Sequence, residues 1–461
     1  MCHLVDILGK TAPPHMICFS RDYYVYFRCY NFRMHKLIIR HARQIVKVCD
    51  NYEPSLHGTK QKKVAILEDP NEGCSLVVGK DGGILDLGKD SDIQEKYMGC
   101  QFERELNASG KCLIPGLIDG HTHPVWVGDR VHEFAMKLAG ASYMDIHKAG
   151  GGIHFTVNHV HEASEEDLYQ SLVQRLDRMV RCGSTFIEAK SGYGLDAENE
   201  IKMLRVIERA KREFSSLEIS STYCGAHAIP KGKTMLEATE DVVNVQIPQI
   251  KGLIDAGELT VENIDVFCEQ GVFDNESSRR ILQAGKDAGM AINFHGDELH
   301  PMNSGELGAS LGARAISHLE EVSDNGIKAM AECDVTAVLL PTTAYILKLK
   351  PPPARQMIEQ GVAVALGSDF NPNAFCYSMP LVMHMACCIL RMSMDEALAG
   401  ATINAAASIG KSKTHGSLEI GKMADIVVVD APRWEHLVYQ LGGHVDVISH
   451  VIKKGTVVHE R

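Results

Sequence analysis

The strongest constraint on the fold is an alternation of short apolar runs and longer helical patterns between residues 113 and 366. Eight of these runs have the length of a buried strand. They begin at residue 113 and continue at 184–188, 219–224, 264–268, 291–294, 315–317, 336–340 and 362–366. Because helical patterns separate them, they predict a parallel (β/α)₈ barrel in the α/β class, with an open doubly wound sheet as the alternative.

Two of the intervening helices have clear end signals. The first has Ser164 as N-cap, acidic residues in its first turn and Gly183 just beyond its end. Residues 196–214 repeat this arrangement, and shorter helical patterns fall near 276–288, 323–332 and 353–360. Residues 379–409 are rich in Ala, Met and Leu and predict two helices after the last strand.

Strand patterns flank the barrel segment on both sides and predict β-structure there. The N-terminal flank has strand patterns at 36–40, 64–67, 75–79 and 84–87, with a hairpin turn at Asp81-Gly82-Gly83. The C-terminal flank has them at 425–430, 447–452 and 456–458. We therefore expect an extension of unknown structure at 1–33, a first part of a small β-sandwich at 34–112, the barrel at 113–410 and the second part of the sandwich at 411–461.

Composition narrows the class of protein. The net charge of −12 argues against a nucleic-acid partner, which requires a basic face. The 14 cysteines include no C-x-x-C pair, which is typical of reduced thiols in a cytoplasmic protein. No apolar run approaches the roughly 18 residues that span a membrane, and the N-terminus lacks the pattern of a signal peptide.

Polar side chains stand where several predicted strands end, which is where barrels of this kind carry their active sites. The first strand leads to His121 and His123, which face the same side of an extended chain. The fifth ends in His295 and the eighth in Asp369. Three imidazoles and a carboxylate can hold one metal ion and leave a position for water, so we assign these four residues as ligands. The alternatives are structural histidines and an N-cap aspartate.

Three further residues suit proton transfer and substrate binding. Glu298 can shuttle a proton beside a metal-bound water, unless it is a solvated glutamate at a helix start. His318 can hold the attacking water or polarise a carbonyl, unless it is a buried structural histidine. Arg130 can grip a substrate carboxylate with two hydrogen bonds, unless it only pairs with Asp129 or Glu133.

Lys190 has a competing interpretation as a carbamylated lysine that bridges two metal ions. We do not favour it, because the sequence requires no second pair of ligands and Tyr193 between two glycines suggests a binding loop.

Four segments resemble the imidazolonepropionases, a family of the amidohydrolase superfamily. They are His121-Thr-His-Pro-Val-Trp-Val-Gly-Asp-Arg130, Lys190-Ser-Gly-Tyr-Gly194, Asn293-Phe-His-Gly-Asp-Glu298 and Gly367-Ser-Asp-Phe-Asn-Pro372. A further stretch at 416–425 resembles the return of the superfamily into its β-sandwich. The resemblance runs from about residue 35 to the C-terminus and leaves residues 1–33 outside it.

The resemblance implies hydrolysis of 4-imidazolone-5-propanoate to N-formimidoyl-L-glutamate in L-histidine degradation, with one zinc or iron ion. It implies the same metal ligands and a homodimer, the commonest symmetric assembly. It places substrate contacts on Arg130, Tyr193, His227, Glu298 and Asn371. Some relatives are expected to carry Gln in place of Glu298, which leaves open whether this residue is the main proton shuttle or a substrate contact.

The expected mechanism is attack of hydroxide on the ring carbonyl. Glu298 and Asp369 handle the proton, His318 stabilises the oxyanion and Arg130 holds the propanoate. The alternatives are another amidohydrolase, such as a purine or pyrimidine deaminase, and an amidohydrolase-like scaffold without catalysis.

Overall fold

A parallel eight-stranded sheet forms the centre of the molecule. The computed structural model describes residues 34–140 and 151–461, so the predicted extension at 1–33 lies outside the described residues. Neighbouring strands of this sheet follow one another in the chain. They are β8 (Leu117–Asp119), β9 (Ser184–Lys190), β10 (Glu218–Ala226), β11 (Asn263–Cys268), β12 (Ala291–Gly296), β13 (Ala315–His318), β14 (Thr336–Leu339) and β15 (Val364–Leu366).

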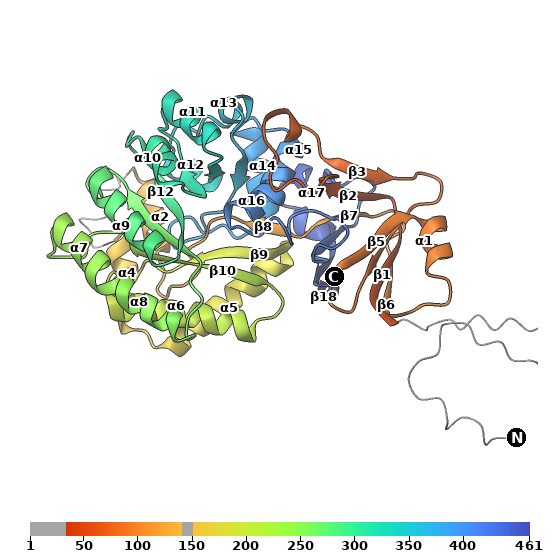
Figure 1. Ribbon diagram of the computed structural model, residues 1–461, viewed down its shortest axis with the longest axis horizontal. Helices are drawn as coiled ribbons and strands as arrows, with labels where there is room; N and C mark the ends of the chain where they lie inside the picture. The colour runs from red at the N-terminus through yellow and green to blue at the C-terminus, as the bar shows by residue number, and fades with distance from the viewer. Residues whose placement is uncertain (1–33, 141–150) are drawn as a thin grey trace, which may run out of the picture.

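The sheet curls until its first and last strands meet. Gly120 N donates to Leu366 O at 3.2 Å, and a parallel bridge joins Thr122 to Phe370. Helices surround the strands (Figure 1). The predicted (β/α)₈ barrel is therefore confirmed, and the open doubly wound sheet is wrong.

Helices follow most strands and cover the outside of the barrel. They are α2 (Val131–Leu138), α4 (Ile153–Glu162), α5 (Glu165–Arg181), α6 (Ala197–Glu213), α7 (Met235–Asp241), α8 (Ile247–Asp255), α9 (Asn275–Asp287), α10 (Ser304–Leu311), α11 (Asp324–Glu332), α12 (Pro341–Leu347) and α13 (Ala354–Glu359). A π-helical segment, Val242–Gln246, joins α7 to α8.

Helix α5 illustrates why these segments are helical. Ser164 and Asp167 exchange side-chain and backbone hydrogen bonds in a capping box, and Gly183 adopts a left-handed φ of 90° just after the helix. The apolar positions Leu168, Leu172 and Leu176 are fully buried. The predicted cap and end of this helix are confirmed, and its apolar positions face the core.

Two further sheets pack beside the barrel (Figure 1). One has the order β5 (Ile84–Lys89), β4 (Cys74–Val78), β1 (Met34–Ala42), β6 (Gln101–Asn107). The other has the order β18 (Thr456–Glu460), β17 (Ile448–Lys453), β16 (Ile426–Val429), β7 (Cys112–Pro115), β2 (Gln44–Val48), β3 (Ala65–Glu68). Apolar side chains from both sheets, including Leu37 and Leu76 from one and Leu113 and Ile426 from the other, form one core. The chain's two ends thus build the predicted β-sandwich together.

The start of the barrel differs from the prediction. Residues 113–115 were expected in the first barrel strand, but they belong to β7, where Ile114 pairs with Val427 of the six-stranded sheet. The barrel strand β8 starts only at Leu117. Gly116 makes this transition possible, because a Cβ there would lie 2.2 Å from Thr185 Oγ1. One continuous apolar run therefore serves two sheets, which its periodicity cannot reveal.

The region after the last barrel strand also differs. Two helices were expected in residues 379–409, and the structure has three, α14 (Met379–Cys388), α15 (Met394–Gly400) and α16 (Ile403–Ser408). Ser393 caps the start of α15, and Thr402, with φ −134° and ψ −96°, interrupts the helical path before α16. The remaining short helices are α1 (Asp90–Lys96), α17 (His436–Tyr439) and the 3-10 helices Gly58–Lys60 and His444–Val447.

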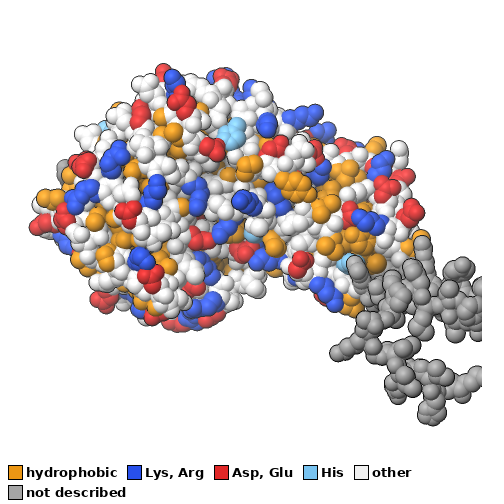
Figure 2. All heavy atoms as spheres, viewed as in Figure 1, with side chains coloured by type: hydrophobic (Ala, Val, Ile, Leu, Met, Phe, Trp, Pro, Cys, Tyr) orange, Lys and Arg blue, Asp and Glu red, His pale blue; other side chains and the backbone are white. Residues whose placement is uncertain are grey.

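The surface carries charges of both signs. On the face drawn in Figure 2, Lys and Arg side chains are interspersed with Asp and Glu over the barrel. Within residues 34–140 and 151–461, no helix has both the length and the apolar character needed to cross a membrane.

Candidate active site

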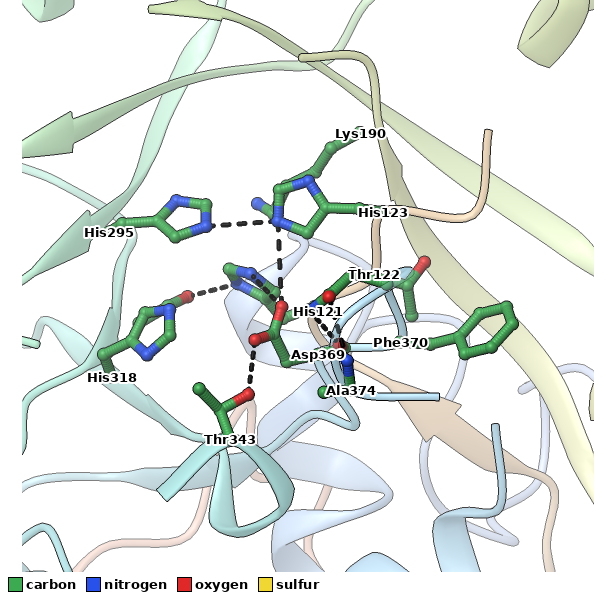
Figure 3. Close-up of polar contacts among 12 residues, drawn as sticks. His121, Thr122, His123, Lys190, His295, His318, Thr343, Asp369, Phe370 and Ala374 are labelled. Carbon is green, nitrogen blue, oxygen red and sulfur yellow. Dashed lines mark hydrogen bonds and ion pairs between the residues drawn. The ribbon is translucent and has the colours of Figure 1, made fainter. Parts of the chain in front are cut away.

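Four residues predicted as metal ligands meet at the carboxyl end of the barrel strands (Figure 3). The Nε2 atoms of His123 and His295 lie 3.1 Å apart. Asp369 Oδ1 lies 3.4 Å from His121 Nε2 and 3.7 Å from His123 Nε2. All four side chains are buried. Strands one, five and eight thus bring residues that are far apart in sequence to one point.

The backbone fixes the loops that carry these ligands. Asp369 N donates to His121 O at 3.0 Å, and His123 N donates to Phe370 O at 2.9 Å, so the loops after β8 and β15 are joined. Asp369 has a left-handed φ of 47°, and the Thr343 hydroxyl donates to its carboxylate. A Cβ at Gly367 would lie 2.8 Å from His121 Cβ, so the close approach of the two loops requires this glycine.

The donor set fits a metal ion. His295 Nδ1 donates to Asp265 Oδ1 at 2.8 Å, so His295 Nε2 presents a lone pair toward His123. One ring nitrogen from each of His121, His123 and His295 lies within 4.8 Å of the others. Burial holds the pKa of His121 and His123 well below its usual value, which keeps their imidazoles neutral, as metal binding requires. Converging lone pairs beside a carboxylate suit zinc or iron.

A buried ion-pair network supports His295 from behind. Asp265 Oδ2 lies 2.6 Å from Lys190 Nζ, which also lies 2.7 Å from Glu188 Oε1. Burial alone would lower the pKa of Lys190, but the charges of Asp265 and Glu188 raise it, so the lysine stays a cation. A charged ammonium between two carboxylates does not support the interpretation of Lys190 as a carbamylated metal bridge.

No role was predicted for Asp265 from the sequence. The available signal was a charged residue inside the apolar strand run at 264–268, where only a partnered carboxylate is tolerated.

Glu298 and His318, the two candidates for proton transfer, lie beside each other in the pocket wall. Glu298 Oε2 lies 3.6 Å from His318 Nε2, and both side chains are buried. Burial, together with Asp369 and Glu269, raises the pKa of Glu298 well above its usual range. Leu299 N donates to Glu269 Oε2 at 2.9 Å, which anchors the loop that carries Glu298.

Arg130 pairs with Glu133, which is the alternative role predicted for it from the sequence. Its Nε and Nη2 donate to the two oxygens of Glu133 at 2.8 and 2.7 Å, and Glu133 Oε1 also accepts from Gly152 N at 2.8 Å. The guanidinium is nevertheless part of the pocket wall. Glu133 therefore fixes the direction of Arg130 rather than removing it from the site.

The three remaining predicted contacts surround His123 and Asp369. His227 stacks on His123 with ring centroids 4.6 Å apart, and burial lowers the pKa of His227 to about 3, so its imidazole is neutral. The Tyr193 ring lies 5.9 Å from that of His123. Asn371 Nδ2 donates to Asp369 O at 2.7 Å, and its Oδ1 accepts from two backbone N–H groups of the same loop. The Asn371 amide thus shapes the loop around the carboxylate ligand.

A cavity of about 410 Å³ opens above this cluster. Every predicted site residue except His121 lines it, and apolar walls come from Ile153, Phe267 and Leu347. A cavity of this size with a few convergent polar groups suits a small molecule.

Comparisons with known proteins give the family. The model of the amidohydrolase family matches residues 112–458. A curated protein of Nematostella vectensis named probable imidazolonepropionase is 67% identical over 429 residues, covering 93% of this chain and 100% of the relative. A human protein of the same name is 60% identical over 426 residues, covering 92% and 99%.

Solved structures support the fold alone. An adenosine deaminase from Xanthomonas campestris with bound zinc superposes with a TM-score of 0.64 at 16% identity, covering 92% of this chain and 93% of that chain. A guanine deaminase from C. acetobutylicum also gives 0.64 at 16% identity, covering 92% and 99%. The family match and the two relatives show that this chain belongs to the amidohydrolase family and, within it, to the imidazolonepropionases.

Proposed function

We propose that this chain hydrolyses the ring amide of 4-imidazolone-5-propanoate to N-formimidoyl-L-glutamate, a step of L-histidine degradation. The observation that carries the proposal is the cluster of His121, His123, His295 and Asp369 beneath a small pocket that Arg130 lines, in a chain 67% identical to a relative named for this activity. A water molecule adds to the ring carbonyl carbon, and the carbon–nitrogen bond of the amide breaks.

The four clustered residues are the proposed ligands of one zinc or iron ion. When bound, the metal supplies Lewis acidity that lowers the pKa of a water molecule and polarises the carbonyl. Asp265 holds His295 with its Nε2 toward the cluster, since Nδ1 is committed to the carboxylate.

Side chains of the pocket move the proton. Burial raises the pKa of Glu298 above its usual value, which suits a group that takes a proton from water and returns it later in the reaction. Asp369 accepts from the Thr343 hydroxyl through Oδ2, which leaves Oδ1 toward the histidines as a second acceptor. His318 directs Nε2 toward Glu298 in the pocket, and this nitrogen stabilises the oxyanion that develops on the carbonyl oxygen.

Arg130 binds the propanoate of the substrate. Glu133 occupies the edge of the guanidinium formed by Nε and Nη2; no described residue hydrogen-bonds to Nη1, so the edge that includes Nη1 can take a second carboxylate. Tyr193, His227 and Asn371 complete the proposed substrate contacts around the ring.

We further propose that the chain forms a cytoplasmic homodimer. It acts on a small anion rather than on nucleic acid or a membrane. The 11 described cysteines are all free thiols, which supports a reducing compartment. Light scattering of the purified protein tests the dimer.

Kinetics of Arg130→Met test the substrate assignment. Hydrogen bonds to a charged group contribute about 1.5–3 kcal/mol, so KM should rise about 10- to 150-fold while kcat changes little. Arg279→Met is the matched control, because Arg279 is an exposed arginine and, in the described part of the chain, it donates to Ser310. An unchanged KM, or release of ammonia from a purine in place of ring opening, would contradict the proposal.

A further inference from the structure

The carboxyl end of β13 has an unusual backbone. His318 and Leu319 both adopt left-handed φ values, 78° and 69°, which are strained for residues with side chains. The loop after β12 holds this conformation, because Leu319 N donates to Gly296 O at 3.1 Å and Glu321 N donates to Asp297 O at 2.8 Å. Strain maintained in this way at a strand end marks a functional position.

The strained turn places Glu320 behind His318. Glu320 Oε2 lies 3.8 Å from His318 Nδ1, while Glu298 Oε2 lies 3.6 Å from His318 Nε2 on the opposite edge of the ring. Glu320 is only 2% exposed. Glu298 lines the pocket. Glu320 is not among the described residues that line it, and it lies next to the pocket residue His318.

Glu320 and the inner edge of His318 are unpartnered in the described part of the chain. Neither carboxyl oxygen of Glu320 forms a hydrogen bond there, and His318 Nδ1 forms none. A buried polar atom without a partner is destabilising, so a small movement that joins these two groups is favourable.

The tautomer of His318 decides which group donates. A neutral imidazole has a single N–H, so hydrogen on one ring nitrogen leaves the other as an acceptor. Stabilising an oxyanion in the pocket requires that hydrogen on Nε2, which leaves Nδ1 as an acceptor. The charged groups that act on Glu320 from neighbouring elements are Glu298, Asp369 and Glu321, all negative, and with burial they favour its neutral acid.

We propose that Glu320 is a positioning residue: a hydrogen bond between its carboxyl group and His318 Nδ1 holds the tautomer whose Nε2–H points into the pocket. The inference rests on the proposed function through the role of His318. It predicts that a side chain with an N–H donor can replace Glu320 and that an apolar one cannot.

Steady-state kinetics of three metal-loaded variants test this assignment. Glu320→Leu should lower kcat at least tenfold with little change in KM or metal content, and Glu320→Gln should recover most of that loss because its amide donates. Glu321→Gln controls for a neighbouring carboxylate. In a His318→Ala background, Glu320→Leu should have no further effect on kcat. An unchanged kcat in Glu320→Leu, or Glu320→Gln as slow as Glu320→Leu, would overturn the proposal.

A second measurement needs no substrate. In protein labelled with ¹⁵N-histidine, the His318 signals are identified by their loss in His318→Ala, and their shifts report the tautomer. Wild type and Glu320→Gln should show hydrogen on Nε2. Hydrogen on Nδ1 in the wild type overturns the inference. Absence of ring opening with the expected tautomer refutes the proposed function alone.

Discussion

Asp265 holds the proposed metal ligand His295 from the barrel interior, so its replacement should weaken metal binding. Its Oδ1 accepts from His295 Nδ1 at 2.8 Å and from His295 N at 3.0 Å, and its Oδ2 pairs with Lys190 at 2.6 Å. Asp265→Asn keeps the size and one acceptor, but it removes the charge that makes His295 a stronger ligand. Its new amide hydrogens also face the ammonium of Lys190.

The magnitude follows from these contacts. Loss of a partner behind a ligating histidine weakens metal binding about 10- to 100-fold, which corresponds to about 1.4–2.8 kcal/mol. Lys190 keeps Glu188 at 2.7 Å, so the fold should lose less than the roughly 3–5 kcal/mol of a buried charge left wholly unpaired. Competition with a chelator of known affinity measures the metal dissociation constant, and urea unfolding measures stability.

Asp255→Asn is the matched control for this substitution. Asp255 is an exposed aspartate that pairs with Lys251 at 2.7 Å, so its loss should leave metal affinity unchanged. If Asp265→Asn binds metal within twofold of the wild type, the carboxylate does not support His295 as a ligand and the reasoning is refuted.

Two further predictions concern the scaffold. Burial would raise the pKa of Glu218, but hydrogen bonds from His415 and Lys453 hold it well below its usual 4.5, so its stabilisation is present above pH 4.5 and disappears as the pH falls through the folded-state value. Glu218→Gln should therefore be less stable than wild type to urea at pH 7, and the gap should narrow toward acid; a gap that widens in acid would contradict this. Leu176→Ala should lower the free energy of unfolding by about 2–5 kcal/mol, because Leu176 is a fully buried residue of α5. A loss below about 1 kcal/mol would mean that the surrounding side chains close the space and leave no cavity.

The sequence predicts the barrel because its determinants are local. Strand runs and the helix capped by Ser164 depend on spacing within a few residues, and all eight strand segments form at or near their expected positions. The transition at Gly116 was missed, because the residues on both sides are equally apolar and only their partners, Val427 in one sheet and Ile187 in the other, distinguish them.

Only part of the candidate site could be predicted from the sequence. His121, His123, His295 and Asp369 were predictable as a set, because the carboxyl ends of parallel strands converge on one rim whatever the intervening loops do. The supporting contacts were not predictable in the same way. Asp265 acts through a neighbouring strand, and the pairing of Arg130 with Glu133 depends on side-chain directions that spacing allows but does not require.

Metal-dependent ring opening tests the central claim most directly. The assay follows the absorbance of 4-imidazolone-5-propanoate with purified protein, after chelation and after return of zinc or iron, with metal content determined in parallel. We expect about one metal ion per chain, loss of activity on chelation, recovery on metal return, and N-formimidoyl-L-glutamate as the product. Ring opening that persists in metal-free protein, or its absence from metal-loaded protein, would contradict the account.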